Sequence, residues 1–346
     1  MGIECTSIRC GTLPRGTRNK ITDVAGVTVG HDTVRGDGVR TGVTVILPGA
    51  DNVFLNKRIA AAYVHNGFGK TLGTVQVQEL GTLETPIALT NTLNVGLVHD
   101  ALVTYTLDRC AADGTPCFSV NPVVGECNDC TLNDIARRAV HASNVQNAIQ
   151  TASTDFAEGD VGAGAGTLCY GLKGGIGSAS RVIEIGGERF TVGVLVQSNF
   201  GRTADLVVDG RRIGEEILRR MKTAPFAPAQ VDKGSIITVL ATDLPVSSRQ
   251  LYRIIRRAGV GLAETGSFMG HGSGEVMLGF STANIRAGAE KCFDTCRFVR
   301  DALLNDAFRA AAEATQEAVL SSMLHAKSAV SLDGTVYPSL ADFDLF

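Results

Sequence analysis

Tryptophan is absent from this sequence of 346 residues, and aromatic residues make up only 5% of it. A surface that stacks nucleic-acid bases is therefore not expected. The net charge of −3 also provides no general attraction to nucleic acid or to an anionic membrane. No run of about 18 uninterrupted apolar residues occurs, so no membrane-spanning helix is predicted. With 44% hydrophobic and 19% charged residues, the composition is that of a globular protein.

A secretory signal and a metal motif are also missing. The first residues lack the apolar core of a signal peptide, so the nine cysteines are expected to be free thiols in the cytoplasm. The pair Cys127 and Cys130 lies far along the chain from Cys292 and Cys296, whereas a zinc ribbon joins two close pairs by a short loop. The six histidines form no H-E-x-x-H motif. We therefore predict no metal site.

The pattern along the chain predicts strands and helices without a linker or an internal repeat, so one catalytic domain over 1–346 is expected. Helical patterns cover 98–112, 131–150, 206–222 and 299–326. The stretch "RFTVGVLVQSNFG" reads as a strand that ends in the polar pair Ser198-Asn199.

Two further local patterns have specific readings. Ser247 and Gln250 have the spacing of a helix capping box. The glycine-dense segment 159–177 lacks G-x-G-x-x-G at a strand-to-helix turn, so it does not predict a dinucleotide site. Its glycine content favours a close-packed loop.

The dipeptide Gly234-Ser235 stands directly before an apolar run that begins at Ile236, and a proline-broken connector precedes it. A serine hydroxyl is a poor nucleophile and needs a base. Cutting the chain before Ser235 would free an α-amine on the same residue, with a reference pKa of about 7.7–8.0 that suits a base near neutral pH. Gly234 would permit the strained backbone that self-cleavage requires. The same dipeptide is also compatible with an ordinary turn.

Ser273 and Glu275 occupy a glycine-flanked turn before another apolar strand. Two residues that lie two positions apart on a strand face the same side, so this pair could hydrogen-bond a serine or its amine. The alternative is a simple turn with a solvated glutamate.

Nine motifs occur in a familiar order, and together they resemble a known family: "GVTVGH", "RTGVTVILPG", "NGFGK", "ELGTLETPIALTNT", "VVGECND", "GLKGGIGSASR", "VQSNFG", "KGSIITVLATD" and "HGSGE". The family is the self-processing serine aminopeptidases, which contains L-aminopeptidase/D-esterases (D-amidases) and β-peptidyl aminopeptidases. The resemblance extends from about residue 20 to about residue 330.

The resemblance implies an α/β (α+β) fold, a four-layer αββα sandwich like that of N-terminal-nucleophile hydrolases but with different connectivity. It implies self-cleavage between Gly234 and Ser235 into an α chain of 1–234 and a β chain of 235–346. It further implies a tetramer of such αβ heterodimers and no metal or organic cofactor.

The resemblance also implies residue roles. Ser235 matches the family nucleophile, and Ser273 and Glu275 match the pair that assists it. Asn199 matches the side-chain amide that helps to form the oxyanion hole, where an N–H donor meets the negative charge of the transition state. Glu126 matches the carboxylate that binds the substrate's free amine.

The chain departs from the family pattern at Asn128, where some members carry a tyrosine near the oxyanion site. Asn128 is still able to donate a hydrogen bond but has no aromatic ring. The run Glu126 to Cys130 therefore leaves the substrate preference open between α- and β-amino acids and between L- and D-residues.

The resulting hypothesis is a serine aminopeptidase that releases N-terminal residues from small peptides, amides or esters through an acyl-enzyme on Ser235. One alternative is an endo-acting amidase of the nylon-oligomer hydrolase type, and another is a relative of the ornithine acetyltransferases; both use a threonine nucleophile. A non-catalytic homologue is the third alternative, although Ser235, Asn199 and Glu275 are all present.

Overall fold

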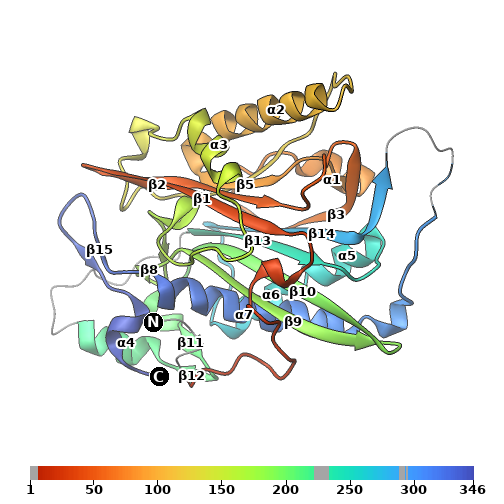
Figure 1. Cartoon of the computed structure of the whole chain (residues 1–346). Helices are drawn as coiled ribbons and strands as arrows, with labels where there is room; N and C mark the ends of the chain where they lie inside the picture. The colour runs from red at the N-terminus through yellow and green to blue at the C-terminus, as the bar shows by residue number, and fades with distance from the viewer. Residues whose placement is uncertain (1–6, 222–233, 288–292, 294) are drawn as a thin grey trace.

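Two β-sheets lie face to face between two layers of helices in the computed structural model (Figure 1), which describes residues 7–221, 234–287, 293 and 295–346. The first sheet has four strands, in the order β1 (Thr28–Gly36), β2 (Val39–Leu47), β5 (Ile87–Asn91) and β6 (Val123–Cys127). The second has six, in the order β4 (Thr82–Leu83), β3 (Asn56–Gly67), β14 (Ser273–Ala287), β13 (Gly234–Thr242), β10 (Glu188–Asn199) and β9 (Ile176–Ile185).

Helices cover the outer face of each sheet. The four-stranded sheet packs against α2 (Val95–Ala112) and α3 (Ala142–Gln150), and the six-stranded sheet packs against α5 (Ser248–Ile255) and α7 (Asn305–His325) (Figure 1). Helix α6 (Ala258–Glu264) lies against α7. The four layers confirm the predicted αββα sandwich.

Short elements complete the fold. Two further helices are α1 (Thr74–Leu80) and α4 (Gly214–Met221). Three hairpins pair β7 (Leu168–Cys169) with β8 (Leu172–Lys173), β11 (Val207–Val208) with β12 (Arg211–Arg212), and β15 (Ala329–Val330) with β16 (Val336–Tyr337). Single 3₁₀ turns span Ile21–Asp23, Thr92–Asn94, Ile135–Arg137, Gly162–Gly164, Thr203–Asp205, Asp301–Leu303 and Leu340–Phe343.

Strand β13 is buried on both faces, which explains its continuous apolar sequence. Ile236 and Leu240 pack into the core on the α7 side of the sheet. Ile237 and Val239 alternate with them and pack into the core between the two sheets. Ser235, two positions before Ile237, therefore belongs to the face that looks toward the four-stranded sheet.

Several local predictions are confirmed. Helix α2 contains the predicted stretch 98–112, and α7 lies inside 299–326. Ser247 caps α5: its Oγ accepts a hydrogen bond from the backbone N–H of Gln250, whose side chain accepts one from the N–H of Ser247.

Two predicted helices are wrong over much of their length. Of 131–150, only α3 is α-helical, because the preceding 3₁₀ turn ends at Arg138, whose left-handed φ of 48° stops a helix. Within 206–222, the residues that the structure describes are helical only in α4. Asp209 and Gly210 both have positive φ and form the tight turn of the β11–β12 hairpin, a turn that the Asp-Gly sequence favours.

Seven of the nine cysteines lie in the part of the chain that the structure describes. Cys10, Cys110, Cys117, Cys127, Cys130, Cys169 and Cys296 are free, while Cys5 and Cys292 lie outside the described residues, as does the connector before Gly234. Among the residues with a described position, no cluster of His, Cys, Asp and Glu could hold a metal ion, and no helix is long and apolar enough to cross a membrane.

Candidate active site

Ser235 lies near the start of β13, in the middle of the six-stranded sheet. In the antiparallel pairing with β10 it stands opposite Asn199, and in the parallel pairing with β14 it stands opposite Gly274. The residue is only 4% exposed. The sheet therefore fixes the backbone of Ser235 on both sides.

Gly234 is required by close packing at this point. A Cβ atom there would lie 2.1 Å from the carbonyl oxygen of Asn199, so no other residue fits without a shift of the β10 backbone. The close approach of β10 is therefore one reason for glycine at this position. The strained backbone that the sequence suggested stays a prediction.

The side-chain amide of Asn199 has a fixed orientation. Its Oδ1 accepts a hydrogen bond of 3.0 Å from the backbone N–H of Leu168, in the β7–β8 hairpin. An amide that uses its oxygen in this way turns its NH₂ group to the other side. Asn199 and Ser235 line the same pocket, so the arrangement supplies an N–H donor next to the serine.

Glu126 reaches the same pocket from the other sheet. Its strand β6 faces β13, and the thiol of the next residue, Cys127, lies 3.5 Å from the carbonyl oxygen of Ser235. Glu126 is 3% exposed; its Oε1 accepts a 2.9 Å hydrogen bond from the backbone N–H of Lys70, and its Oε2 accepts one from the hydroxyl of Thr92. Carboxylate oxygens can accept further bonds, so Glu126 remains able to bind a ligand amine.

The pocket has a volume of about 540 Å³, which is enough for a small ligand. It is lined by Phe68, Lys70, Thr92, Glu126, Asn128, Cys130, Thr131, Leu168, Asn199, Phe200, Gly234, Ser235 and Gly272. Five of the seven predicted site residues are therefore gathered around one cavity: Gly234, Ser235, Asn199, Glu126 and Asn128.

Ser273 and Glu275 lie at the start of β14 and not in a turn. Both are buried, and the Ser273 hydroxyl donates a hydrogen bond to Oε1 of Glu275. The two side chains therefore share one face, as their spacing predicted, and the solvated-glutamate alternative is wrong because Glu275 is fully buried.

The pair does not line the pocket. Ser273 stands opposite Gly234 and Glu275 opposite Ile236, so both belong to the sheet face away from the side chain of Ser235. The peptide link before Ser235 lies beside Ser273. A chain end created at that link would leave its amine next to the pair.

Asn128 lies at the exposed side of the pocket. Its Oδ1 accepts a 3.0 Å hydrogen bond from the backbone N–H of Cys130, which leaves its NH₂ group available as a donor. This agrees with the donor function that the sequence left for this position.

Sequence reasoning gave no role to Phe68, Lys70, Thr92 and Leu168, which the fold adds to the pocket. Three of them lie shortly after a strand, whereas Leu168 belongs to β7. Phe68 and Lys70 come just after β3, and Thr92 comes directly after β5. Polar residues at strand ends are a usable signal for such positions.

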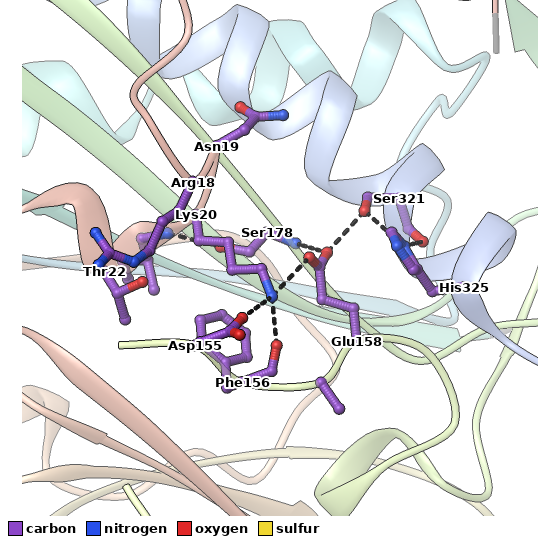
Figure 2. A network of polar contacts seen from close by, with 12 residues as sticks. Arg18, Asn19, Lys20, Thr22, Asp155, Phe156, Glu158, Ser178, Ser321 and His325 are labelled. Carbon is purple, nitrogen blue, oxygen red and sulfur yellow. Dashed lines mark hydrogen bonds and ion pairs between the residues drawn. The ribbon is translucent and has the colours of Figure 1, made fainter. Parts of the chain in front are cut away.

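A second group of polar side chains contains serine, histidine and glutamate; we call it the Glu158 cluster (Figure 2). Glu158 Oε2 accepts 2.7 Å hydrogen bonds from the backbone N–H of Ser178 and from the hydroxyl of Ser321, and Lys20 Nζ lies 3.7 Å from Oε1. The Ser321 hydroxyl is 3.0 Å from Nδ1 of His325.

The Glu158 cluster does not have the geometry of a catalytic triad. In a triad the histidine stands between the serine and the acid, whereas here Ser321 stands between Glu158 and His325. The Glu158 side chain is 6% exposed, and burial raises the pKa of its carboxyl. The cluster joins the N-terminal segment, β9 and α7 and has no part in the pocket of Ser235.

A serine on a strand, an amide beside it and a buried carboxylate across the pocket form the arrangement of an acyl-transferring hydrolase. Known proteins agree with this class. The model of Peptidase family S58 matches residues 19–337. The beta-peptidyl aminopeptidase BapA of Sphingosinicella xenopeptidilytica is 39% identical over 329 residues, which cover 89% of this chain and 81% of that protein.

Solved structures are similar over nearly the whole chain. The PH0078 protein of Pyrococcus horikoshii OT3 has 44% identity and a TM-score of 0.93, over 100% of this chain and 97% of that one. The L-aminopeptidase D-Ala-esterase/amidase of Ochrobactrum anthropi, described as a variant of the Ntn hydrolase fold, has 34% identity and a TM-score of 0.88, over 96% and 93%. This chain therefore belongs to peptidase family S58, and it is a serine aminopeptidase.

Proposed function

We propose that the chain cleaves itself between Gly234 and Ser235 and that the new N-terminal Ser235 is the nucleophile. The observation that carries the proposal is the position of Ser235, which stands opposite Asn199 on one strand and beside Ser273 and Glu275 on the other. The two products, 1–234 and 235–346, would stay together because β13 and β14 are inner strands of a sheet that also contains β3, β9 and β10.

The proposed reaction forms and breaks an acyl-enzyme. The Oγ of Ser235 attacks the scissile carbonyl while the α-amine of the same residue takes the hydroxyl proton and passes it to the leaving amine or alcohol. The NH₂ group of Asn199 donates to the oxyanion. Ser273 and Glu275 hydrogen-bond the α-amine and tune its affinity for the proton, and a water molecule then releases the acyl group.

Glu126 would give selectivity for a free amine. Its carboxylate is 3% exposed and already receives two hydrogen bonds from the protein, so it is held in one orientation at the pocket wall. An ammonium that pairs with it places the N-terminal residue of a small peptide, amide or ester across Ser235. Asn128 would add a donor on the open side of the pocket.

We also propose a tetramer of αβ heterodimers and a cytoplasmic location, as in the family that the sequence resembles. The free state of the seven described cysteines supports a reducing compartment. Size-exclusion chromatography with light scattering measures the assembly directly.

Processing tests the nucleophile. Purified protein should separate into two chains of about 25 and 12 kDa, in proportion to their lengths. N-terminal sequencing of the smaller chain should read Ser-Ile-Ile-Thr-Val. Ser235→Ala should remain one inactive chain, and a fully active wild-type enzyme that stays uncut would overturn the mechanism.

Selectivity for the free amine tests Glu126. Glu126→Gln keeps the side-chain shape and removes the charge, so activity on free-amine substrates should fall sharply and the preference over N-acetylated analogues should shrink. The ratio of kcat/KM for the two substrates, on protein shown to be fully processed, is the measurement. An unchanged ratio would make Glu126 a brace for Lys70 and Thr92 instead.

A further inference from the structure

The pocket is lined by a basic side chain, that of Lys70, in addition to the carboxylate of Glu126. Of the described residues that line it, Lys70 is the only basic one and Glu126 the only acidic one. The backbone N–H of Lys70 binds Glu126, while its Nζ lies 4.5 Å from the ring centroid of Phe68. Lys70 and Phe68 are both exposed at the entrance of the pocket.

The Lys70 ammonium forms no ion pair with an acidic side chain in the part of the chain that the structure describes. The aromatic face of Phe68 positions the cation without neutralising it. A cavity with a carboxylate at its wall and an ammonium at its entrance is complementary to a molecule that carries both an amine and a carboxylate.

From this charge pattern, and resting on the proposed function, we infer that Lys70 binds a carboxylate of the substrate. Two parts of a small peptide can supply that group: the C-terminal carboxylate of the leaving amino acid, or an acidic side chain on the N-terminal residue. The enzyme should therefore prefer such substrates over their uncharged counterparts.

The test uses fully processed enzyme and the N-terminal residue X that it accepts best. One arm compares kcat/KM for the dipeptide X-Ala with that for X-Ala amide, and the other compares aspartyl with asparaginyl p-nitroanilide. Wild type should prefer the charged substrate about twofold to fivefold in one arm, the range for an exposed ion pair, and less so at high salt.

Lys70→Met should remove this preference, and Lys70→Arg should keep it. Lys57→Met is the matched control, because Lys57 belongs to β3 outside the pocket and pairs with Glu84; its ratio should equal that of wild type. No preference in either arm, or a preference that survives Lys70→Met, overturns the inference. Failure to hydrolyse even an uncharged X p-nitroanilide would instead overturn the proposed function itself, and the subsite with it.

A different observation concerns Lys173, which is completely buried. Its Nζ donates to three backbone carbonyls, those of Gly164, Thr167 and Gly174, at 3.0, 2.9 and 2.8 Å. None of the described carboxylates lies within ion-pair distance of it. Burial lowers the pKa of this lysine to about 7. Burying an ammonium carries a desolvation cost, which its three hydrogen bonds to the loop must offset.

The three carbonyls belong to the loop that holds Asn199. Leu168, whose N–H binds Oδ1 of Asn199, directly follows Thr167, and the N–H of Gly174 closes the loop on the carbonyl of Thr167. Without the ammonium, the carbonyl of Gly174 would lose its donor, whereas those of Gly164 and Thr167 would keep only the bonds from within the loop.

We propose that Lys173 is a positioning residue, which acts on the reaction by holding Leu168 and thereby the amide of Asn199 in place. Lys173→Met should lower kcat at least tenfold with little change in KM, because the oxyanion donor serves the transition state and not substrate binding. Lys173→Gln, which has two N–H donors for the three carbonyls, should fall between Met and wild type.

A double-mutant cycle separates this role from general stability. With kcat referred to processed chains counted by mass spectrometry, Lys173→Met in an Asn199→Ala background should cost less than about threefold, since the residue acts through Asn199. The same fold loss in both backgrounds overturns the proposal. If neither Lys173 variant yields folded, processed enzyme, the lysine is a folding residue and the positioning role is withdrawn. If Asn199→Ala alone leaves kcat unchanged, the oxyanion assignment is what fails.

Discussion

The pocket of Ser235 and the Glu158 cluster both combine serine with glutamate side chains. The Glu158 cluster has all three residue types of a hydrolase triad, yet its serine is held between the acid and the histidine (Figure 2). The pocket has no histidine among its described lining residues, but its serine lies beside a cavity. Ser235 therefore has the access to a cavity that a nucleophile needs, whereas Ser321 is buried between two protein partners.

The two places also differ in how their carboxylates are used. Glu158 is satisfied by protein donors from three segments, so it joins the N-terminal segment to β9 and α7. Glu126 has two protein donors and faces an open volume. A buried carboxylate closed by the protein supports the fold, whereas one that faces a cavity can bind a ligand.

The largest expected effect is a loss of kcat in a variant of the Ser235 pocket. Asn199→Ala should lower kcat by about 10²–10³, with little change in KM, because it removes one oxyanion donor. The N–H of Leu168 also loses its acceptor, so the thermal midpoint should fall, and kcat is therefore referred to folded, processed enzyme. A variant with weaker substrate binding at unchanged kcat would instead make Asn199 a binding residue.

The second expected effect is on stability and leaves kcat unchanged. Glu158→Ala leaves the N–H of Ser178 without its acceptor and removes one of the two side-chain partners of the Ser321 hydroxyl, so it should lower the free energy of unfolding by about 1–3 kcal/mol. Urea titration of the uncut Ser235→Ala chain gives this value without chain dissociation. In the active enzyme, kcat per folded molecule should be unchanged. A loss of kcat comparable to that of Asn199→Ala would erase the distinction between the two places.

The third effect is a pH dependence of stability. Because the pKa of Glu158 is raised in the folded chain, the unfolded chain loses this proton first as pH rises. Its contribution to stability is therefore present below the usual glutamate value and is lost as pH rises through the raised pKa, by up to about 1.4 kcal/mol per pH unit. The charged groups that face it are Lys20, Asp155 and His325. The glutamine of Glu158→Gln cannot titrate, so the free energy of unfolding of this variant should depend less steeply on pH than that of wild type. Equal slopes for the two proteins would contradict the assignment.

The smallest expected effect is a loss of stability in a control variant. Ser247→Ala removes the cap of α5, which lines neither the pocket of Ser235 nor the Glu158 cluster, and should cost about 1 kcal/mol of stability. Neither kcat nor the slope with pH should change. A change in kcat would show that stability and activity are coupled across the fold, and the first two comparisons would need correction by that amount.

The sequence by itself determined the features that depend on neighbours along the chain. The apolar run after Ser235 indicated a buried strand, Ser273 and Glu275 were placed on one face by their spacing, and the capping box of Ser247 was correct. The motifs, through family resemblance, supplied the αββα sandwich and the candidate roles. The local pattern failed at 131–150 and 206–222, where left-handed residues at Arg138 and Asp209 interrupt the helical period.

Only the tertiary structure decided how separate segments meet at the pocket. Glu126 approaches Ser235 because two sheets pack face to face, and the NH₂ group of Asn199 is aimed by the N–H of Leu168, thirty-one residues earlier in the chain. Lys70 is assigned a function because it lines a cavity, and Lys173 because it donates hydrogen bonds inside a loop that closes on itself. Periodicity reports which face of an element is buried, but the partner on that face is set by the packing of the sheets, which no local pattern encodes.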